Sequence, residues 1–180
     1  MGSKTNNMIP TPFNRSYWVV SNKLLAGEIP AAKTAEETIE KIKALADCGI
    51  SVILNLMEAD ETDSSNQPFY EYSLHLQPFG MQMIRLPIED LSVPTVAEMN
   101  EILATIDRCN AEGKAVYVHC WGGIGRTGTV VGCYLIEAQL ATTEDVFIKI
   151  DELRSSTSTI DRPSPETIEQ IEFVEKWKIN

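Results

Sequence analysis

The sequence is poor in the residues that build metal cages and disulfide frameworks. Its 180 residues include two histidines and four cysteines, Cys48, Cys109, Cys120 and Cys133, at irregular spacing and without a C-x-x-C pair. Structural zinc sites use closely spaced Cys and His ligands, and small secreted domains use dense cysteines. We therefore expect no metal, no cofactor and no disulfide framework, and a cytoplasmic location where thiols stay reduced.

Positive charge is scarce as well. Lys and Arg number 15 against 26 Asp and Glu, which gives a formal net charge of −11. Phosphate backbones and anionic lipid surfaces select cationic protein surfaces. We expect neither a nucleic-acid nor a membrane partner. Polyanionic substrates are also disfavoured, although less firmly, because a small site can be locally positive on an acidic protein.

Long apolar runs are missing. The longest uncharged apolar stretch, residues 127–136, is far shorter than the ~20 residues that cross a bilayer. Residues 1–15 lack the apolar segment of a secretory signal. The composition, 43% hydrophobic and 23% charged, is that of a globular chain. We expect a flexible lead-in over residues 1–14 and a single monomeric domain over residues 15–180.

Within that domain, short apolar runs alternate with segments of helical periodicity. Strands are predicted over residues 17–20, 23–26, 51–56, 83–86 and 115–119. Helices are predicted over residues 34–47, 95–112, 127–139, 143–154 and 165–178. This alternation indicates an α/β fold with a central, mostly parallel sheet flanked by helices.

Three of the predicted helices carry start signals. Thr34 precedes Glu37, and Thr95 precedes Glu98, at the spacing of a capping box. In the last helix, Ser164 is the predicted N-cap, followed by a proline at the first helical position. The acidic loop after the third strand, with carboxylates at positions 58, 60, 61 and 63, is interpreted as a solvated face.

One segment concentrates residues with chemical function. Residues 119–128 have the sequence His-Cys-Trp-Gly-Gly-Ile-Gly-Arg-Thr-Gly, between a predicted strand and a predicted helix. Glycines let successive backbone N–H groups turn inward as a concave nest, and the following helix N-terminus adds its dipole. The segment therefore predicts a phosphate-sized anion site that needs no metal.

Cys120 and Arg126 belong to the same ten residues. Converging N–H groups stabilise a thiolate, so Cys120 is a candidate nucleophile. The guanidinium of Arg126 can grip two phosphoryl oxygens at once, which lysine cannot do. A buried structural cysteine is the alternative for Cys120, but it explains neither the glycines nor the arginine. The other three cysteines fit core packing.

The segment matches, at each fixed position, the signature His-Cys-x-x-Gly-x-Gly-Arg-[Ser/Thr]-Gly of cysteine-dependent protein tyrosine and dual-specificity phosphatases. The resemblance extends to residues 86–90, Leu-Pro-Ile-Glu-Asp, which are similar to the general-acid loop of the compact members. Residues 18–30 and 162–170 resemble the opening and closing segments of such domains. The resemblance implies a dual-specificity-like phosphatase fold over nearly all of residues 16–178.

The resemblance also implies roles. Cys120 would attack phosphorus to give a phosphocysteine, and Asp90 would protonate the leaving oxygen and later deprotonate the hydrolytic water. Thr127 would donate a hydrogen bond to the departing sulfur, His119 would brace the loop, and Gln170 would position the water. The phosphoryl group would be bound by Trp121, Gly122, Gly123, Ile124, Gly125 and Arg126.

Two positions depart from the family pattern. Glu89 stands where proline or a small apolar residue is common, and it places a second carboxylate beside Asp90. Either could serve as the acid; Asp90 is preferred on its alignment with the motif. Trp121 and Ile124 occupy positions where members directed to inositol phosphates and lipids tend to carry lysines, which makes a polyphosphorylated substrate less expected.

The sequence thus predicts a metal-independent phosphomonoester hydrolase of tyrosine or dual-specificity type. Its partner would be a phosphorylated protein or a small phosphomonoester. The alternatives are a pseudophosphatase that binds phosphate with weak turnover, a small-molecule or inositol phosphate phosphatase, and a rhodanese-type sulfur transferase. A pseudophosphatase usually lacks the cysteine, arginine or aspartate that this chain retains, and rhodanese loops do not require the Gly-x-Gly-Arg-Thr-Gly run.

Overall fold

The apolar strand runs assemble into a five-stranded sheet in the order β1-β2-β5-β3-β4. In the computed structural model, which describes residues 10–178, β1 pairs antiparallel with β2, and the other neighbours pair in parallel. The strands are β1 (Ser16–Val20), β2 (Leu24–Gly27), β3 (Ile50–Asn55), β4 (Gln82–Arg85) and β5 (Ala115–His119). All residues of β2 and β5 are buried, as expected for central strands covered on both faces.

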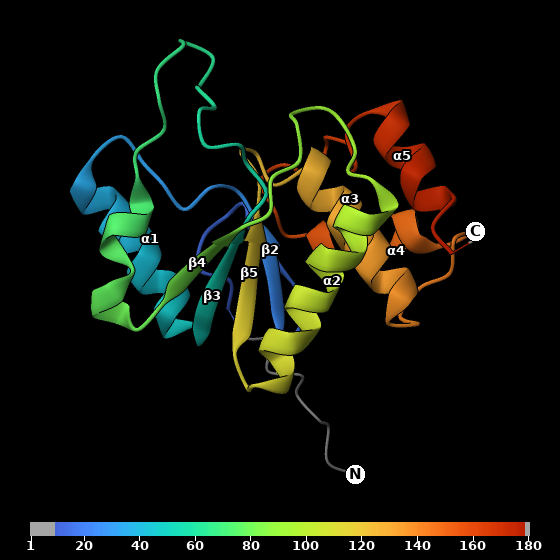
Figure 1. Ribbon diagram of the computed structural model, residues 1–180, viewed down its shortest axis with the longest axis horizontal. Coiled ribbons are helices and arrows are strands. Elements are labelled where there is room, and N and C mark those ends of the chain that lie inside the picture. The colour runs from blue at the N-terminus through green and yellow to red at the C-terminus, as the bar shows by residue number, and fades with distance from the viewer. Residues whose placement is uncertain (1–9, 179–180) are drawn as a thin grey trace.

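Helices cover the two faces unequally (Figure 1). On one side lie α1 (Ala35–Asp47) and the 3-10 turns η1 (Tyr72–His75) and η2 (Gln77–Phe79). On the other side lie α2 (Val96–Ala111), α3 (Gly125–Glu137), α4 (Val146–Arg154) and α5 (Ile168–Glu175). The predicted α/β class, with a mostly parallel sheet flanked by helices, is confirmed.

The parallel register brings the carboxyl ends of four strands, β2, β3, β4 and β5, to one edge of the sheet. His119, the last residue of β5, is paired with Gly27 at the end of β2 and with Asn55 at the end of β3, and Asn55 is paired in turn with Arg85 at the end of β4. The loops that follow β3, β4 and β5 therefore leave the sheet side by side. In parallel α/β sheets this edge is where ligands bind.

The helix starts agree with the predicted signals in part. Thr95 and Glu98 form the complete capping box, whereas Thr34 caps α1 only by accepting from the Glu37 amide at 3.2 Å. The prediction that Ser164 caps the last helix is wrong, because its hydroxyl donates to the Ile124 carbonyl at 2.7 Å. Thr167 forms the N-cap in its place, and α5 begins at Ile168.

The N-terminal segment falls partly outside the described residues. Residues 1–9 of the predicted flexible lead-in are not among them. Toward its other end, the Phe13 ring lies edge-on against Tyr117, with centroids 5.9 Å apart, and the Asn14 carbonyl accepts from the Ser158 amide at 3.0 Å. These contacts fasten residues 13 and 14 to the domain.

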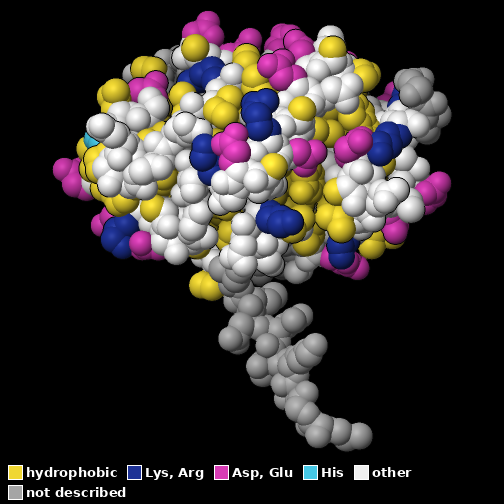
Figure 2. All heavy atoms as spheres, turned by 60° about the horizontal axis from the view of Figure 1, so that its bottom comes forward, with side chains coloured by type: hydrophobic (Ala, Val, Ile, Leu, Met, Phe, Trp, Pro, Cys, Tyr) yellow, Lys and Arg dark blue, Asp and Glu magenta, His cyan; other side chains and the backbone are white. Residues whose placement is uncertain are grey.

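The surface at the end where the parallel strands begin carries acidic and basic side chains interspersed, with apolar side chains between them (Figure 2). Between residues 10 and 178 no helix combines the length and the hydrophobicity that a membrane span requires.

The α3 helix is the buried centre of the helical layer, and its glycines allow close approach. All residues from Gly125 to Ile136 are buried. A Cβ at position 132 would lie 2.7 Å from Cγ1 and 3.0 Å from Cγ2 of Val174 on α5. Because Gln170 of α5 forms part of the wall of the cavity described below, the contact between Gly132 and Val174 sets the distance between that wall and α3.

We expect Gly132→Ala to lower the free energy of unfolding by about 1–3 kcal/mol, since the added methyl overpacks the interface with α5. Val174→Ala makes room for that methyl. The double variant should therefore be more stable than the sum of the two single changes by about 1 kcal/mol. Urea unfolding of the unchanged protein, the two single variants and the double variant measures this coupling. Strictly additive free energies would show that the interface between α3 and α5 has room for the added methyl.

Candidate active site

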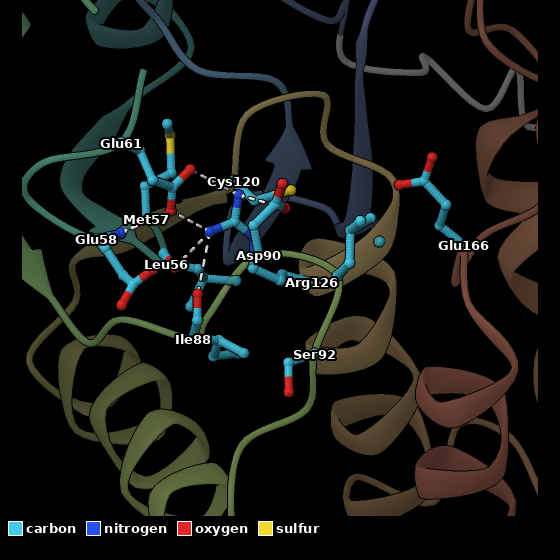
Figure 3. A network of polar contacts seen from close by, with 12 residues as sticks. Leu56, Met57, Glu58, Glu61, Ile88, Asp90, Ser92, Cys120, Arg126 and Glu166 are labelled. Atoms are coloured by element: carbon cyan, nitrogen blue, oxygen red, sulfur yellow. Dashed lines mark hydrogen bonds and ion pairs between the residues drawn. The ribbon is translucent and has the colours of Figure 1, made fainter. Parts of the chain in front are cut away.

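The loops after β4 and β5, the start of α3, and the segment that leads into α5 line a cavity of about 400 Å3, together with Arg15. Most of the predicted site residues line it: Asp90, Cys120, Trp121, Gly122, Ile124, Gly125, Arg126 and Gln170. Of the other predicted residues, His119, Gly123 and Thr127 are buried. Figure 3 shows Cys120, Asp90 and the Arg126 guanidinium gathered at the centre, with Glu166 of the segment before α5 on the far side.

Cys120 lies at the cavity wall, directly after β5. Its side chain is 3% exposed, and the Thr127 hydroxyl donates to Sγ at 3.1 Å from the first turn of α3. Gly123, in the left-handed conformation at φ 71°, lets the loop turn back over the end of β2. Cys120 therefore borders the cavity beside the N-terminus of α3.

His119, the last residue of β5, supports the loop that follows it and is uncharged. Its Nδ1 lies 2.9 Å from the Cys120 carbonyl oxygen, so Nδ1 carries the proton and donates. Nε2 therefore accepts from the Tyr72 hydroxyl at 2.7 Å. Complete burial lowers the pKa of His119 to about 3, and the nearby Arg85 and Arg126 charges add to that effect. The neutral ring holds the backbone at Cys120 in place.

Arg126 is a buried charge with several partners. The side chain is 1% exposed, and both terminal nitrogens bind the Glu61 carboxylate, with Nη2 3.0 Å from Oε2. Nη2 is also 3.0 Å from Oδ1 of Asp90, and Nη1 donates to the Ile88 carbonyl at 3.0 Å. Burial opposes the charged form, but the hydrogen bond to Glu61 and the neighbouring negative charges outweigh it and raise the Arg126 pKa.

Glu61 is the site residue that the sequence reasoning missed. The acidic loop was interpreted as a solvated face, which holds for Glu58 and Asp60. For Glu61 it is wrong: the side chain is 12% exposed and binds Arg126. Its position in the loop after a central parallel strand is the signal that could have indicated it, because such loops border the site.

The two neighbouring carboxylates of the loop after β4 differ in placement. Asp90 lines the cavity with a side chain that is 49% exposed, and it faces the guanidinium of Arg126. Glu89 is exposed and is not part of the cavity lining. The geometry therefore favours Asp90 as the group that reaches a ligand in the cavity.

Gln170 forms part of the cavity wall, although its amide is already engaged. Oε1 accepts from the amides of Glu166 and Thr167, and Nε2 donates to the Ser92 carbonyl at 3.1 Å. Its role in positioning a water stays a prediction.

A mostly parallel sheet with a cysteine, a glycine-rich loop and a buried arginine at the end of a central strand is the arrangement expected of the cysteine-dependent tyrosine and dual-specificity phosphatases. The chain belongs to that class: the model of the family described as "Polymorphic toxin system, DSP-PTPase phosphatase" matches residues 28–139.

Individual relatives agree. The chain is 29% identical over 136 residues to phosphatidylglycerophosphate phosphatase PTPMT2 of Arabidopsis thaliana, covering 75% of this chain and 54% of the relative. It is 35% identical over 86 residues to phosphatidylglycerophosphatase and protein-tyrosine phosphatase 1 of Mus musculus, covering 47% and 44%. The chain thus spans about half the length of these two relatives.

Solved structures share the fold. The active form of Tk-PTP superimposes with a TM-score of 0.72 at 22% identity, covering 96% of this chain and 99% of that one. The kinase associated phosphatase gives 0.71 at 20% identity, covering 92% and 93%.

We expect Glu61→Gln to lower kcat/KM for an aryl phosphate about tenfold or more, because the charge that orients the buried guanidinium is lost. Asp60→Asn, one position away on the exposed part of the same loop, is the matched control and should behave as the unchanged protein. Equal activity of the Glu61→Gln variant would show that the remaining partners of Arg126 suffice to orient it.

The burial of His119 also predicts acid sensitivity. Its folded pKa of about 3 lies below the ordinary 6.5, so its contribution is complete above pH 6.5 and declines as pH falls toward 3. Over that range the protein should lose up to about 1.4 kcal/mol more per pH unit than the His119→Asn variant. Chemical unfolding of both from pH 7 to pH 4 tests this, and parallel curves would contradict it.

Proposed function

We propose that this chain is a phosphatase of the protein tyrosine or dual-specificity type, which hydrolyses phosphomonoesters through a phosphocysteine intermediate. The observation that carries the proposal is the convergence of three groups on one cavity. Cys120 lies at its wall with Thr127 Oγ1 3.1 Å from the sulfur, and Arg126 and Asp90 line the same space. These are a nucleophile, a clamp for the phosphoryl oxygens and an acid at one point.

In the first step, the Cys120 thiolate attacks phosphorus. The S–P bond forms, the bond from phosphorus to the leaving oxygen breaks, and Asp90 gives that oxygen its proton. Main-chain amides of residues 121–125 and the Arg126 guanidinium bind the three non-bridging oxygens, whose charge is most widely spread in the transition state. Arg126 and the amides supply the stabilising charge, so this step needs no metal.

In the second step, water attacks the phosphocysteine. Asp90, now ionised, accepts a proton from that water, the new P–O bond forms, and the S–P bond breaks. The electron pair returns to sulfur, where the Thr127 hydroxyl stabilises the thiolate by its hydrogen bond. His119, neutral and held between Tyr72 and the Cys120 carbonyl, supports the loop and transfers no proton.

The test is hydrolysis of phosphotyrosine by the purified protein. Turnover should survive a chelator, nearly vanish in Cys120→Ser, and fall by about 100-fold in Asp90→Asn, the loss expected for a general acid. Glu89→Gln is the matched control and should retain activity. A crippled Glu89→Gln beside an active Asp90→Asn would reverse the assignment of the acid. Phosphate binding with negligible turnover would favour the pseudophosphatase.

A phospholipid phosphomonoester is the second candidate substrate. The names of two relatives include phosphatidylglycerophosphate chemistry, and Arg15 and Arg162 line the cavity in addition to Arg126. These arginines supply cations that the loop itself lacks at Trp121 and Ile124. Comparing kcat/KM for phosphotyrosyl peptides, phosphoseryl peptides and phosphatidylglycerophosphate in mixed micelles distinguishes the two substrate classes.

A further inference from the structure

Gln170 connects three parts of the active site that are distant in sequence. It stands in the first turn of α5 and is fully buried. Its Oε1 accepts from the amides of Glu166 and Thr167, at 3.1 and 3.2 Å, and Nε2 donates to the Ser92 carbonyl at 3.1 Å. One side chain thus completes the cap of α5 and holds the loop that follows β4.

The contact with Ser92 lies two residues after Asp90. A second hydrogen bond accompanies it, from the Thr167 hydroxyl to the Leu91 carbonyl at 3.4 Å. Leu91 has φ 61°, in the left-handed region, and its side chain is 55% exposed. Apolar burial does little to hold Leu91 in that conformation. The Ser92 amide donates to the Glu89 carbonyl at 3.1 Å and closes the turn around Leu91, and the two hydrogen bonds from α5 attach that turn to the helix.

The residues before Asp90 are held by a different set of contacts. Ile88 is 2% exposed, its amide donates to the Leu56 carbonyl at 3.0 Å, and its carbonyl accepts from Arg126 at 3.0 Å. Asp90 therefore lies between a buried anchor at Ile88 and a hydrogen-bonded anchor at Ser92. Figure 3 shows Ile88 and Ser92 along the same segment, with Asp90 directed toward Arg126. Losing either anchor frees the carboxylate to move.

Gln170 also contacts the glycine-rich segment of residues 119–128, here called the phosphate loop. A Cβ at position 125 would lie 3.0 Å from Oε1 and 3.2 Å from Nε2 of Gln170. The amide therefore packs directly on Gly125, the first residue of α3. The planar amide of Gln170 therefore sets the distance between the phosphate loop and the acid loop, the segment after β4 that carries Asp90.

The hydrogen bonds of Gln170 engage most of its amide with protein partners. The two lone pairs of Oε1 accept from two backbone amides, and one hydrogen of Nε2 is donated to the Ser92 carbonyl. The second hydrogen of Nε2 can be donated to a water, so the positioning of a water stays a separate prediction that the experiment below distinguishes.

We propose that Gln170 is a positioning residue that acts through Asp90, by holding the general-acid loop against α5 and the phosphate loop. This inference rests on the proposed function, because it requires Asp90 to be the acid. It predicts that kcat/KM, which reports the first step, falls most for substrates whose leaving group needs the proton from Asp90.

The experiment compares two substrates in Gln170→Ala. Phosphotyrosine has a poor leaving group that needs the acid, whereas p-nitrophenyl phosphate has an activated one that needs it little. We expect kcat/KM to fall about tenfold or more for phosphotyrosine and less than about twofold for p-nitrophenyl phosphate, a fraction of the full general-acid effect. In the Asp90→Asn background, Gln170→Ala should add almost nothing for either substrate.

Gln170→Glu tests whether the effect of Gln170→Ala is only a folding defect. It keeps a carboxylate oxygen to accept from the α5 amides, where negative charge is favourable, and removes only the donor to Ser92. We expect the same difference between substrates as in Gln170→Ala. Thr34→Ala, which removes the N-cap of α1 away from the site, is the matched control and should leave the substrate ratio unchanged.

Four results would overturn the inference. Equal losses for both substrates would indicate a general structural role. A larger burst of phosphoenzyme with p-nitrophenyl phosphate in Gln170→Ala than in Asp90→Asn would indicate that Gln170 positions the water. If Asp90→Asn itself shows no dependence on the leaving group, the acid assignment falls and the inference falls with it; an impaired Asp90→Asn beside a normal Gln170→Ala overturns the inference alone.

Discussion

The guanidinium of Arg126 lies in the interior, where an uncompensated charge would cost several kcal/mol. Each of the three loops at the carboxyl edge of the sheet contributes to its stabilisation. The loop after β3 supplies Glu61, the loop after β4 supplies the Ile88 carbonyl and Asp90, and the phosphate loop after β5 leads into the helix that carries Arg126 itself. The three loops therefore adopt their positions together.

This shared dependence explains how three loops hold a preorganised site. A phosphoryl group needs donors fixed before it arrives, because reorganising them during reaction costs part of the catalytic effect. The neutral His119 fixes the loop backbone from below, and Thr127 fixes the environment of the sulfur. Gln170 and Thr167 add the corresponding hydrogen bonds from α5 to the acid loop. Each contact joins a loop to a regular element.

The acidic net charge and the anion site are compatible because of where the cations lie. The chain carries eleven more formal negative than positive charges, yet Arg15, Arg126 and Arg162 all line one cavity. Arg15 is paired at 3.4 Å with Glu28, which also binds Lys41 at 2.8 Å, so this carboxylate is shared between two cations. Arg162 is likewise paired with Glu166 at 2.6 Å. The charged side chains that line the cavity are thus three arginines and two carboxylates, Asp90 and Glu166, which leaves a positive balance at one place on an otherwise acidic protein.

Much of the fold and the centre of the site could be predicted from the sequence. Strand and helix periodicities, the Thr95 cap and residues 119–128 act over a few neighbouring positions, so the order of residues is sufficient to indicate them. The local rule failed at Ser164, because its hydroxyl had a better partner in the distant Ile124 carbonyl. It failed at Glu61 because an acidic loop has the same pattern whether it faces water or a buried cation.

By itself, then, the sequence determined the α/β class, the glycine nest, and the pairing of Cys120 with Arg126 at a spacing that one loop spans. Only the tertiary structure decided that Glu61 and not its neighbours binds Arg126, that Asp90 and not Glu89 faces the cavity, and that Gln170 joins α5 to the acid loop. Those choices depend on parallel strand register, which brings residues 61, 90 and 126 to one edge. Register is set by burial over the whole sheet, and no single segment encodes it.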